Sequence, residues 1–255
     1  MKAMEESLER DPSSGQLTIS YPFLPCTERM KDNSRQAIAI QSKVEQRLQR
    51  DGLLKQYNEE MKQMIERGAV VSLGKEDTQY YGPVHYITHF GVLNPESKST
   101  KLRIVSNSAS KNQHSGLSLN DCMEDGPNAL NGLLQVLLGW RSLEAGMLYD
   151  LSKAYQRMKT RIKERNLRRL VWRPEPGMAW RHFGYDCANF GDKLAPLALE
   201  LGKKRTAEEG EKIDSMAAEQ LLTLTYVDDN CGGGTENDVK RMVGEGKQEG
   251  RIPKI

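Results

Sequence analysis

Apolar residues recur at helical spacing in two neighbouring segments of the chain. The run SRQAIAIQSKVEQRLQR at 34–50 is followed by LLKQYNEEMKQMIERG at 53–68, and Asp51 and Gly52 separate them. Apolar positions three and four apart form one stripe of a helix, and a glycine commonly follows the last helical residue. The pattern therefore predicts two amphipathic helices.

Short β-prone runs follow these helices. PVHYITHFGVL at 83–93 and KLRIVS at 101–106 flank the polar stretch NPESKST, which predicts a β-hairpin. AGMLYD at 145–150 and LTLTYVDD at 222–229 predict two further strands, which we expect to be buried because they are apolar. Helical patterns recur at 127–143, 192–220 and 236–245.

The order of these elements mixes helices and strands without a regular βαβ alternation, which favours an α+β fold. The chain contains neither G-x-G-x-x-G nor G-x-x-x-x-G-K-[ST], so nucleotide binding of the Rossmann or P-loop kind has no support. Residues 1–30 show no period and contain DPSSG and YPFLPC, so we expect an irregular N-terminal extension.

The composition and the apolar runs indicate the cellular location of the protein. Hydrophobic residues make up 37% of the 255 residues, charged residues 28%, and the mean hydropathy is −0.67. The longest apolar run is too short to span a bilayer, and the charged N-terminus does not resemble a signal peptide. The four cysteines form no C-x-x-C pair, which predicts free thiols. We expect a cytoplasmic protein that is not secreted, with no membrane association and no disulfide partner.

Charge is nearly balanced overall, at +2, but one segment is strongly basic. RMKTRIKERNLRR, from Arg157 to Arg169, contains Glu164 as its single acid. Such a run is either a solvated face or a patch that neutralises phosphates. His85 and His89 alternate on one predicted strand, and we interpret them as structural.

Two predicted strands end in acids, one at Asp150 and the other at Asp228 and Asp229. Taken singly, Asp150 could cap the next helix, and the Asp pair could form the tip of an ordinary hairpin. If the strands are neighbours, three carboxylates meet at one sheet edge, which is unfavourable without a cation. Hard oxygen ligands suit Mg²⁺, and two such ions would support phosphoryl transfer.

Adjacent strand residues point to opposite faces, so Asp228 and Asp229 can both approach a metal only if the chain turns there. We expect Asn230 and the following glycines to provide that turn. Asp150 and Asp228 are then the principal ligands, and Asp229 is an auxiliary charge.

Four motifs in this order resemble reverse transcriptases. YVDD at 226–229 looks like their catalytic hairpin, and YDLSKAY at 149–155 resembles the matching strand-to-helix motif. NFGDKLAP at 189–196 resembles their third motif, although Phe190 stands where retroviral enzymes carry Gln. STKLRIVSNSASKNQHSGLSLND at 99–121 is similar to the fingers segment before the first acid.

The helices ending in MIERGAV, YGPVHYITHFGVLNP at 81–95 and VDDNCGGGTENDVKRMVGE resemble the BEL/Pao group of LTR retrotransposons in particular. The resemblance covers roughly residues 20 to 255. It implies an RNA-directed DNA polymerase with the right-hand fold of fingers and palm, whose antiparallel palm sheet packs on helices. The implied segments are an extension at 1–30, fingers at 31–116, palm at 117–157, fingers at 158–194, and palm with the catalytic hairpin at 195–255.

The sequence ends 26 residues after Asp229. Compared with the resembled family, we expect the chain to lack the primer grip, the thumb and an RNase H or integrase segment. We therefore expect a fragment of a retrotransposon Pol polyprotein, which would work in a retroelement particle and which alone would grip a duplex poorly. The alternative is a catalytically inactive remnant that keeps the fold and at most binds nucleic acid or protein. Another two-metal nucleotidyl enzyme, such as a cyclase, fits the fingers segment and NFGDKLAP less well.

The resemblance also implies a set of site residues. Asp150, Asp228 and Asp229, with the backbone of Leu151, would hold two Mg²⁺ ions, or Mn²⁺ in their place. The implied partners are deoxynucleoside triphosphates and an RNA or DNA template with a DNA primer. The backbone around Ser152, Lys153 and Ala154 would lie against the triphosphate, and Tyr155 would lie beneath the sugar. The remaining implied nucleotide-binding residues are Arg103, Phe190 and Gly191, with Lys98 and Lys101 as secondary candidates for the triphosphate.

Two of these residues have simpler explanations when they are taken alone. A tyrosine such as Tyr155 is more often part of a core, and an arginine such as Arg103 is more often a surface cation on a strand. Their joint spacing with the acids is what favours the nucleotide site.

Overall fold

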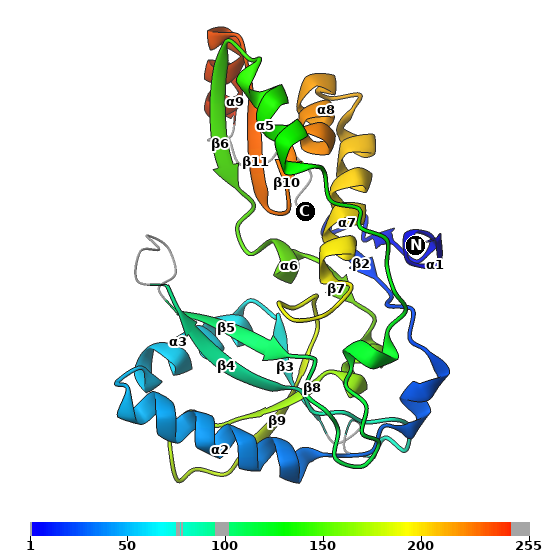
Figure 1. Cartoon of the computed structure of the whole chain (residues 1–255), viewed down its shortest axis with the longest axis vertical. Helices are drawn as coiled ribbons and strands as arrows, with labels where there is room; N and C mark the ends of the chain where they lie inside the picture. The colour runs from blue at the N-terminus through cyan, green and yellow to red at the C-terminus, as the bar shows by residue number, and fades with distance from the viewer. Residues whose placement is uncertain (1, 75–76, 78, 95–101, 246–255) are drawn as a thin grey trace. The chain divides into compact units, whose positions relative to one another are not determined.

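The computed structural model describes the chain except for residues 1, 75–76, 78, 95–101 and 246–255. The fold is α+β with small antiparallel sheets, as the sequence predicted (Figure 1). The chain divides into two compact units, each made of separate segments. Unit 1 comprises residues 1–19, 126–158 and 196–255, and unit 2 comprises residues 20–125 and 159–195.

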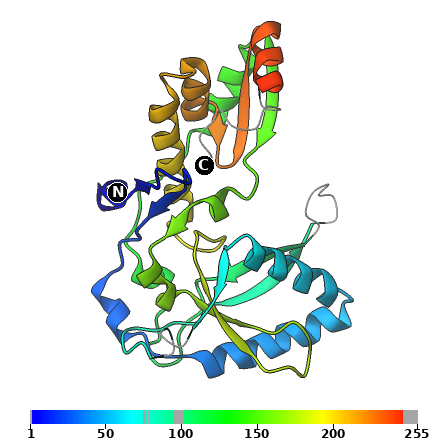
Figure 2. The ribbon, with the colours of Figure 1, turned by 180° about the vertical axis from the view of Figure 1, so that it is seen from behind.

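Unit 1 is built around a three-stranded antiparallel sheet of order β10-β11-β6. Helices α5, α8 and α9 pack against this sheet, and α7 and α8 lie side by side (Figure 2). The elements of this unit are α1 (Lys2–Glu6), β1 (Glu9–Arg10), β2 (Leu17–Ile19), α5 (Leu133–Arg141), β6 (Ala145–Asp150), α6 (Ala154–Arg157), α7 (Ala195–Gly210), α8 (Ser215–Thr223), β10 (Thr225–Tyr226), β11 (Asp229–Gly234) and α9 (Glu236–Glu245).

Unit 2 contains an antiparallel sheet of order β3-β9-β8 and the hairpin β4-β5, with α2 and α3 packed against them. The helical elements of this unit are η1 (Pro25–Arg29), α2 (Ser34–Arg50), α3 (Leu54–Glu66), η2 (Asn120–Cys122) and η3 (Ile162–Leu167). Its strands are β3 (Val70–Ser72), β4 (Thr88–Leu93), β5 (Leu102–Asn107), β7 (Lys159–Thr160), β8 (Arg169–Trp172) and β9 (Arg181–Tyr185).

The helical periodicity at 34–68 is confirmed by α2 and α3, which end within two residues of the expected bounds. Gly68 follows α3 with a φ of +67°, the left-handed conformation that glycine adopts without steric cost. The buried face of α2 contributes Ala37 to a core cluster with Val84, Tyr86 and Val171. The expected strands on both sides of 94–100 are also present as β4 and β5.

The N-terminal residues are not irregular, contrary to the expectation for 1–30. β1 and β2 pair as a hairpin, and DPSSG forms its loop because Asp11 accepts hydrogen bonds from the backbone and the hydroxyl of Ser13, at 2.8 and 2.7 Å. Short Asx turns of this kind carry no hydrophobic period and are hard to recognise in a sequence. Arg10 in β1 pairs with Glu209 of α7 at 2.5 Å, which ties the hairpin to unit 1.

The observed unit boundaries differ from the expected segments at 1–30, which is divided between the units after residue 19, and at 117–125, which belongs to unit 2. Local backbone contacts explain the placement of 117–125. Phe23 and Met123 form an isolated antiparallel bridge, and the Leu24 amide donates to the Cys122 carbonyl at 2.8 Å. The segment is therefore paired with the start of unit 2 rather than with the helix α5 that follows it.

The basic run at 157–169 is not one continuous solvated face, although Arg157 and Lys163 are exposed. Arg168 and Arg169 are buried, at 0% and 4% exposed, although they belong to a run of charges. Arg168 forms an ion pair with Asp192, and Arg169 donates two hydrogen bonds to the side-chain oxygen of Asn166. These cations stabilise the interior of unit 2.

Among the described residues, no helix has both the length and the apolar character needed to cross a bilayer. All four cysteines are free thiols.

His89 and His85 are fully buried in unit 2, in keeping with a structural role. The His89 ring stacks on the Tyr57 ring with centroids 5.9 Å apart, and its Nε2 donates to the Val171 carbonyl at 3.0 Å. The Tyr57 hydroxyl donates to the other ring nitrogen. Burial lowers the pKa of His89 to about 4, and it lowers the pKa of His85 to about 4 as well.

We predict that acid destabilises the protein through these two histidines. An unfolded histidine takes up a proton near its ordinary pKa of about 6.5, whereas the buried rings remain neutral down to about pH 4. The unfolded state therefore binds more protons in this window, so the free energy of unfolding falls by about 2 kcal/mol per histidine between about pH 7 and about pH 5. Urea denaturation across this range measures the fall.

The variant His89→Phe should have about half the pH slope of the wild type, whatever its absolute stability. His114→Gln removes an exposed histidine and is the matched control, with an unchanged slope. A flat profile in the wild type would contradict the prediction.

Candidate active site

Asp150 ends β6 and Asp229 begins β11, and these two strands are neighbours. The strand expected at 222–229 is wrong in its extent, because Leu222 and Thr223 end α8 and the short β10 pairs with β11 rather than with β6. In the register of β11 with β6, Asp229 lies directly opposite Asp150. Directly opposed residues of an antiparallel pair point to the same face, with Cβ atoms about 5 Å apart. Both side chains are exposed, and neither forms an ion pair or side-chain hydrogen bond with a described residue. The pairing therefore places two uncompensated negative charges side by side.

Asp228 lies in the turn that joins β10 to β11. Tyr226 pairs with Asp229, so Val227 and Asp228 are the two central residues of the hairpin turn. Val227 has a φ of +56°, and a positive φ at the first central position alone is the sign pattern of a type II′ turn, where glycine is preferred. The prediction of a turn at Asn230 and the glycines is wrong, because the chain turns at Val227 and Asp228.

Asn230 instead locks the hairpin against β6. Its side chain is 1% exposed, donates to the carbonyls of Asp228 at 3.1 Å and Tyr149 at 3.4 Å, and accepts from the Thr225 hydroxyl at 2.8 Å. The amide of Leu151 donates to the same Asp228 carbonyl at 3.1 Å. Nothing in the sequence indicates this role, because an asparagine close to several glycines is typical of a turn.

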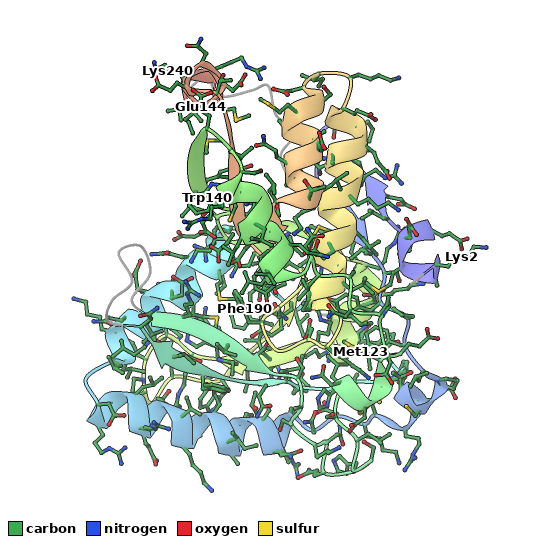
Figure 3. The ribbon with its side chains drawn as sticks, turned by 45° about the horizontal axis from the view of Figure 1, so that its top comes forward. Lys2, Met123, Trp140, Glu144, Phe190 and Lys240 are labelled. Atoms are coloured by element: carbon green, nitrogen blue, oxygen red, sulfur yellow. The ribbon has the colours of Figure 1, made fainter. Side chains whose placement is uncertain are left out.

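The glycines lie inside β11, where they permit close packing. A Cβ on Gly233 would lie 2.2 Å from the Ala145 carbonyl oxygen of β6. The Gln220 amide of α8 both donates to the Gly233 carbonyl, at 2.6 Å, and accepts from its N–H, at 2.9 Å. In the same way Trp140 of α5 (Figure 3) lies 2.5 Å from where a Cβ on Gly146 would be.

The expectation that AGMLYD is buried is wrong. β6 is an edge strand of its sheet, and Leu148 and Tyr149 remain 65% and 41% exposed. An apolar run of this length has the pattern of a central strand, and nothing in it marks the edge position.

Beyond Asp150 the chain makes a tight turn into α6. The Ala154 amide donates to the Leu151 carbonyl at 3.0 Å, and Lys153 between them has a φ of +57°. Ala154 is 4% exposed and Tyr155 is 7% exposed, whereas Ser152 is exposed. Burial raises the pKa of the Tyr155 hydroxyl, and the Asp228 carboxylate raises that pKa further. Tyr155 is therefore buried within the electrostatic reach of Asp228.

Val227 and Lys153 are the only non-glycine residues with a positive φ in the described parts of the chain. Each is strained by about 1–3 kcal/mol, and strained residues persist only where the surrounding structure holds them. One directly precedes Asp228, and the other follows Asp150 by three residues. Both strained residues of the described chain thus adjoin the candidate acids.

Three expected nucleotide-binding residues belong to unit 2. Arg103 is exposed on β5, in the face opposite to its buried neighbours Leu102 and Ile104. Phe190 (Figure 3) is 37% exposed, and its carbonyl accepts from both the amide and the hydroxyl of Ser106 of β5, at 3.2 and 2.6 Å. The same strand thus carries Arg103 and holds the loop with Phe190.

The residues after Phe190 anchor this loop. Gly191 has a φ of +108°, and a Cβ there would lie 2.1 Å from the Ser106 carbonyl oxygen, so only glycine fits. Asp192 is buried between the Ser108 hydroxyl and the Arg168 guanidinium, each 2.6 Å away. Sequence reasoning missed Arg168, because a charge run is usually solvated. Lys98 and Lys101 lie outside the described residues.

The described side chains contain no group of three or more His, Cys, Asp or Glu that could hold a metal ion. What the structure assembles is a pair of opposed carboxylates, Asp150 and Asp229, with Asp228 half-buried in the adjoining turn. The two-ion site and the choice of Asp150 and Asp228 as principal ligands remain predictions. A comparison with models of known protein families finds no match, and a comparison with curated proteins finds no similar sequence.

We predict that Asn230→Ala destabilises the hairpin. The substitution leaves the Thr225 hydroxyl without its acceptor and removes a donor from the Asp228 carbonyl, so unfolding should become easier by about 1–3 kcal/mol. Chemical denaturation measures the change. Asn237→Ala, on the exposed surface of α9, is the control and should be neutral or slightly stabilising. Equal effects of the two variants would rule out the locking role.

Proposed function

We propose that this chain is the fingers and palm core of an RNA-directed DNA polymerase, a reverse transcriptase of the BEL/Pao type. The observation that supports the proposal best is the pairing of Asp150 with Asp229, with Asp228 in the connecting turn. The resemblance of YDLSKAY and YVDD required the acids of two separate segments to meet. In this proposal unit 1 is the palm and unit 2 is the fingers.

The donor chemistry fits divalent cations. Two exposed carboxylates face the same side without a cationic partner among the described residues, and such a pair is unfavourable unless a cation neutralises it. Oxygen donors of this kind suit Mg²⁺, which takes one or two carboxylates plus substrate phosphates. Asp150, Asp228, Asp229 and the Leu151 carbonyl would hold the ions. Bound Mg²⁺ supplies charge that stabilises the attacking and leaving oxygens of nucleotide transfer.

The chain's own residues act by positioning. The reaction joins the primer 3′ oxygen to the α-phosphorus of a deoxynucleoside triphosphate and releases pyrophosphate. The turn at Ser152, Lys153 and Ala154 would place backbone groups against the triphosphate, and Tyr155 would limit space at the sugar. For Arg103, Phe190 and Gly191 of unit 2, the nucleotide-binding role rests on the resemblance, and the guanidinium of Arg103 has the fork of donors that suits phosphate oxygens.

We predict that the full chain extends a DNA primer on an RNA template when Mg²⁺ or Mn²⁺ is supplied, and that Asp150→Asn and Asp229→Asn each reduce extension at least about a hundredfold. The reason is that each change removes one of two opposed charges that would hold the cation. Extension is followed on labelled primer by gel electrophoresis.

Glu211→Gln removes an exposed acid of the same unit and serves as the matched control, with unchanged extension. Circular dichroism should be the same for all these variants. A wild-type chain that neither extends primers nor binds Mn²⁺ would favour the inactive remnant over the polymerase.

Sugar selection gives a separate prediction. If the Tyr155 ring limits space beneath the sugar, Tyr155→Val should raise incorporation of a ribonucleotide relative to the matched deoxynucleotide by about tenfold or more. Because Tyr155 is buried, the variant should also lose stability, by about 3 kcal/mol for the lost packing. The ratio of the two incorporation efficiencies, rather than either rate, is therefore the measurement. An unchanged ratio would make Tyr155 a core residue only.

A further inference from the structure

Lys203 of α7 has a buried side chain that ends at the hairpin turn. The residue is 1% exposed, and its Nζ donates to the Val227 carbonyl at 2.9 Å. One turn earlier on the same helix, Glu200 forms an ion pair with the same Nζ at 2.6 Å. The Asp228 carboxylate also interacts electrostatically with this ammonium group. A single buried cation thus connects α7 to the turn that contains Asp228.

Burying an ammonium group is costly, and a buried ion pair is often no more stable than well-packed apolar side chains of the same volume. Burial lowers the pKa of Lys203, and the bond to Glu200 opposes that shift. A methionine would fill the same space without this cost. Stability alone therefore does not account for a lysine at this position. What a methionine could not replace is the hydrogen bond from Nζ to the Val227 carbonyl.

The carbonyl that Lys203 holds belongs to the strained residue. Valine is β-branched, and a positive φ is a genuine outlier for such a residue. The turn keeps this conformation only if other contacts hold it. On the other side of Asp228, the carbonyl of Asp228 itself accepts from the Leu151 amide and from Asn230. Both peptide groups that flank the Asp228 Cα are therefore fixed by hydrogen bonds.

We propose that Lys203 is a positioning residue that holds the Val227 turn in its strained conformation and thereby sets the direction of the Asp228 side chain. Glu200 keeps the ammonium group in place. The conformational part of this inference stands on the structure of unit 1 alone, and only its consequence for metal binding and extension rests on the proposed function.

The test is a double-mutant cycle of Lys203→Met with Val227→Gly, measured by urea denaturation of the full chain. Glycine adopts a positive φ without strain, so it removes the need for the clamp. Lys203→Met alone should raise the unfolding equilibrium constant by about a hundredfold, because it leaves Glu200 unpaired and releases the turn. In the Val227→Gly background, the rise in the unfolding equilibrium constant caused by Lys203→Met should be at least about tenfold smaller.

Lys204→Met is the matched control, since Lys204 is the next residue of the helix but lies half exposed in a surface ion pair. It should have little effect in either background. If Lys203→Met alone does not fold, the double variant should fold again. Additive effects of the two substitutions, or a double variant that is also unfolded, would overturn the proposal.

A Mn²⁺ titration followed by electron paramagnetic resonance distinguishes the positioning role of Lys203 from the effect of its positive charge. Removing a nearby positive charge would by itself tighten Mn²⁺ binding, whereas loss of the Asp228 direction weakens it. We expect Lys203→Met to weaken Mn²⁺ binding at least about tenfold, and Val227→Gly to restore part of the loss. Tighter binding in Lys203→Met would overturn the positioning role. A positive stability cycle in a chain that binds no Mn²⁺ would leave the clamp in place and refute the polymerase proposal instead.

Discussion

The candidate site depends on the register of β11 against β6. A shift of one residue would move Asp229 to the other face of the sheet, because successive side chains alternate. The observed register is electrostatically unfavourable, since it opposes two carboxylates. It is held from the interior by the almost fully buried Asn230, whose side chain donates to the Tyr149 carbonyl of β6, and the Gln220 bonds to Gly233 hold β11 on α8. Interior hydrogen bonds thus impose a juxtaposition that the surface charges alone would avoid.

The same small region contains several other features that oppose folding. Val227 and Lys153 have strained backbones, and Lys203 carries a buried ammonium group. Each feature costs on the order of 1 kcal/mol or more, against a total stability of about 5–15 kcal/mol for a typical domain. Elsewhere in the described chain, positive φ angles fall on glycines. Departures from local preference that gather in one place are typical of functional sites, and this gathering points to the same residues as the sequence motifs.

The sequence predicted the helices better than it predicted the position of the turn and the interior contacts of single residues. The amphipathic period defined α2 and α3 almost to the residue, since a helical stripe must face the core. The candidate acids could be recognised in the sequence because each of two apolar runs ends in one or two aspartates. The turn was misplaced, however, because Asn230 and the glycines are ordinary turn residues and Val227 is not. The interior role of Arg168 could not be inferred either, since its partner Asp192 lies 24 residues away in sequence.

The loop after β9 shows how one motif combines two physical roles. In NFGD, Gly191 lets the backbone approach Ser106 closely, and the buried Asp192 pairs with Arg168. Phe190 and Gly191 are exposed. A change at Gly191 or Asp192 therefore removes support from the loop. The β10–β11 hairpin of unit 1 shows the same combination, because the exposed Asp229 is followed by the buried Asn230 that anchors the turn.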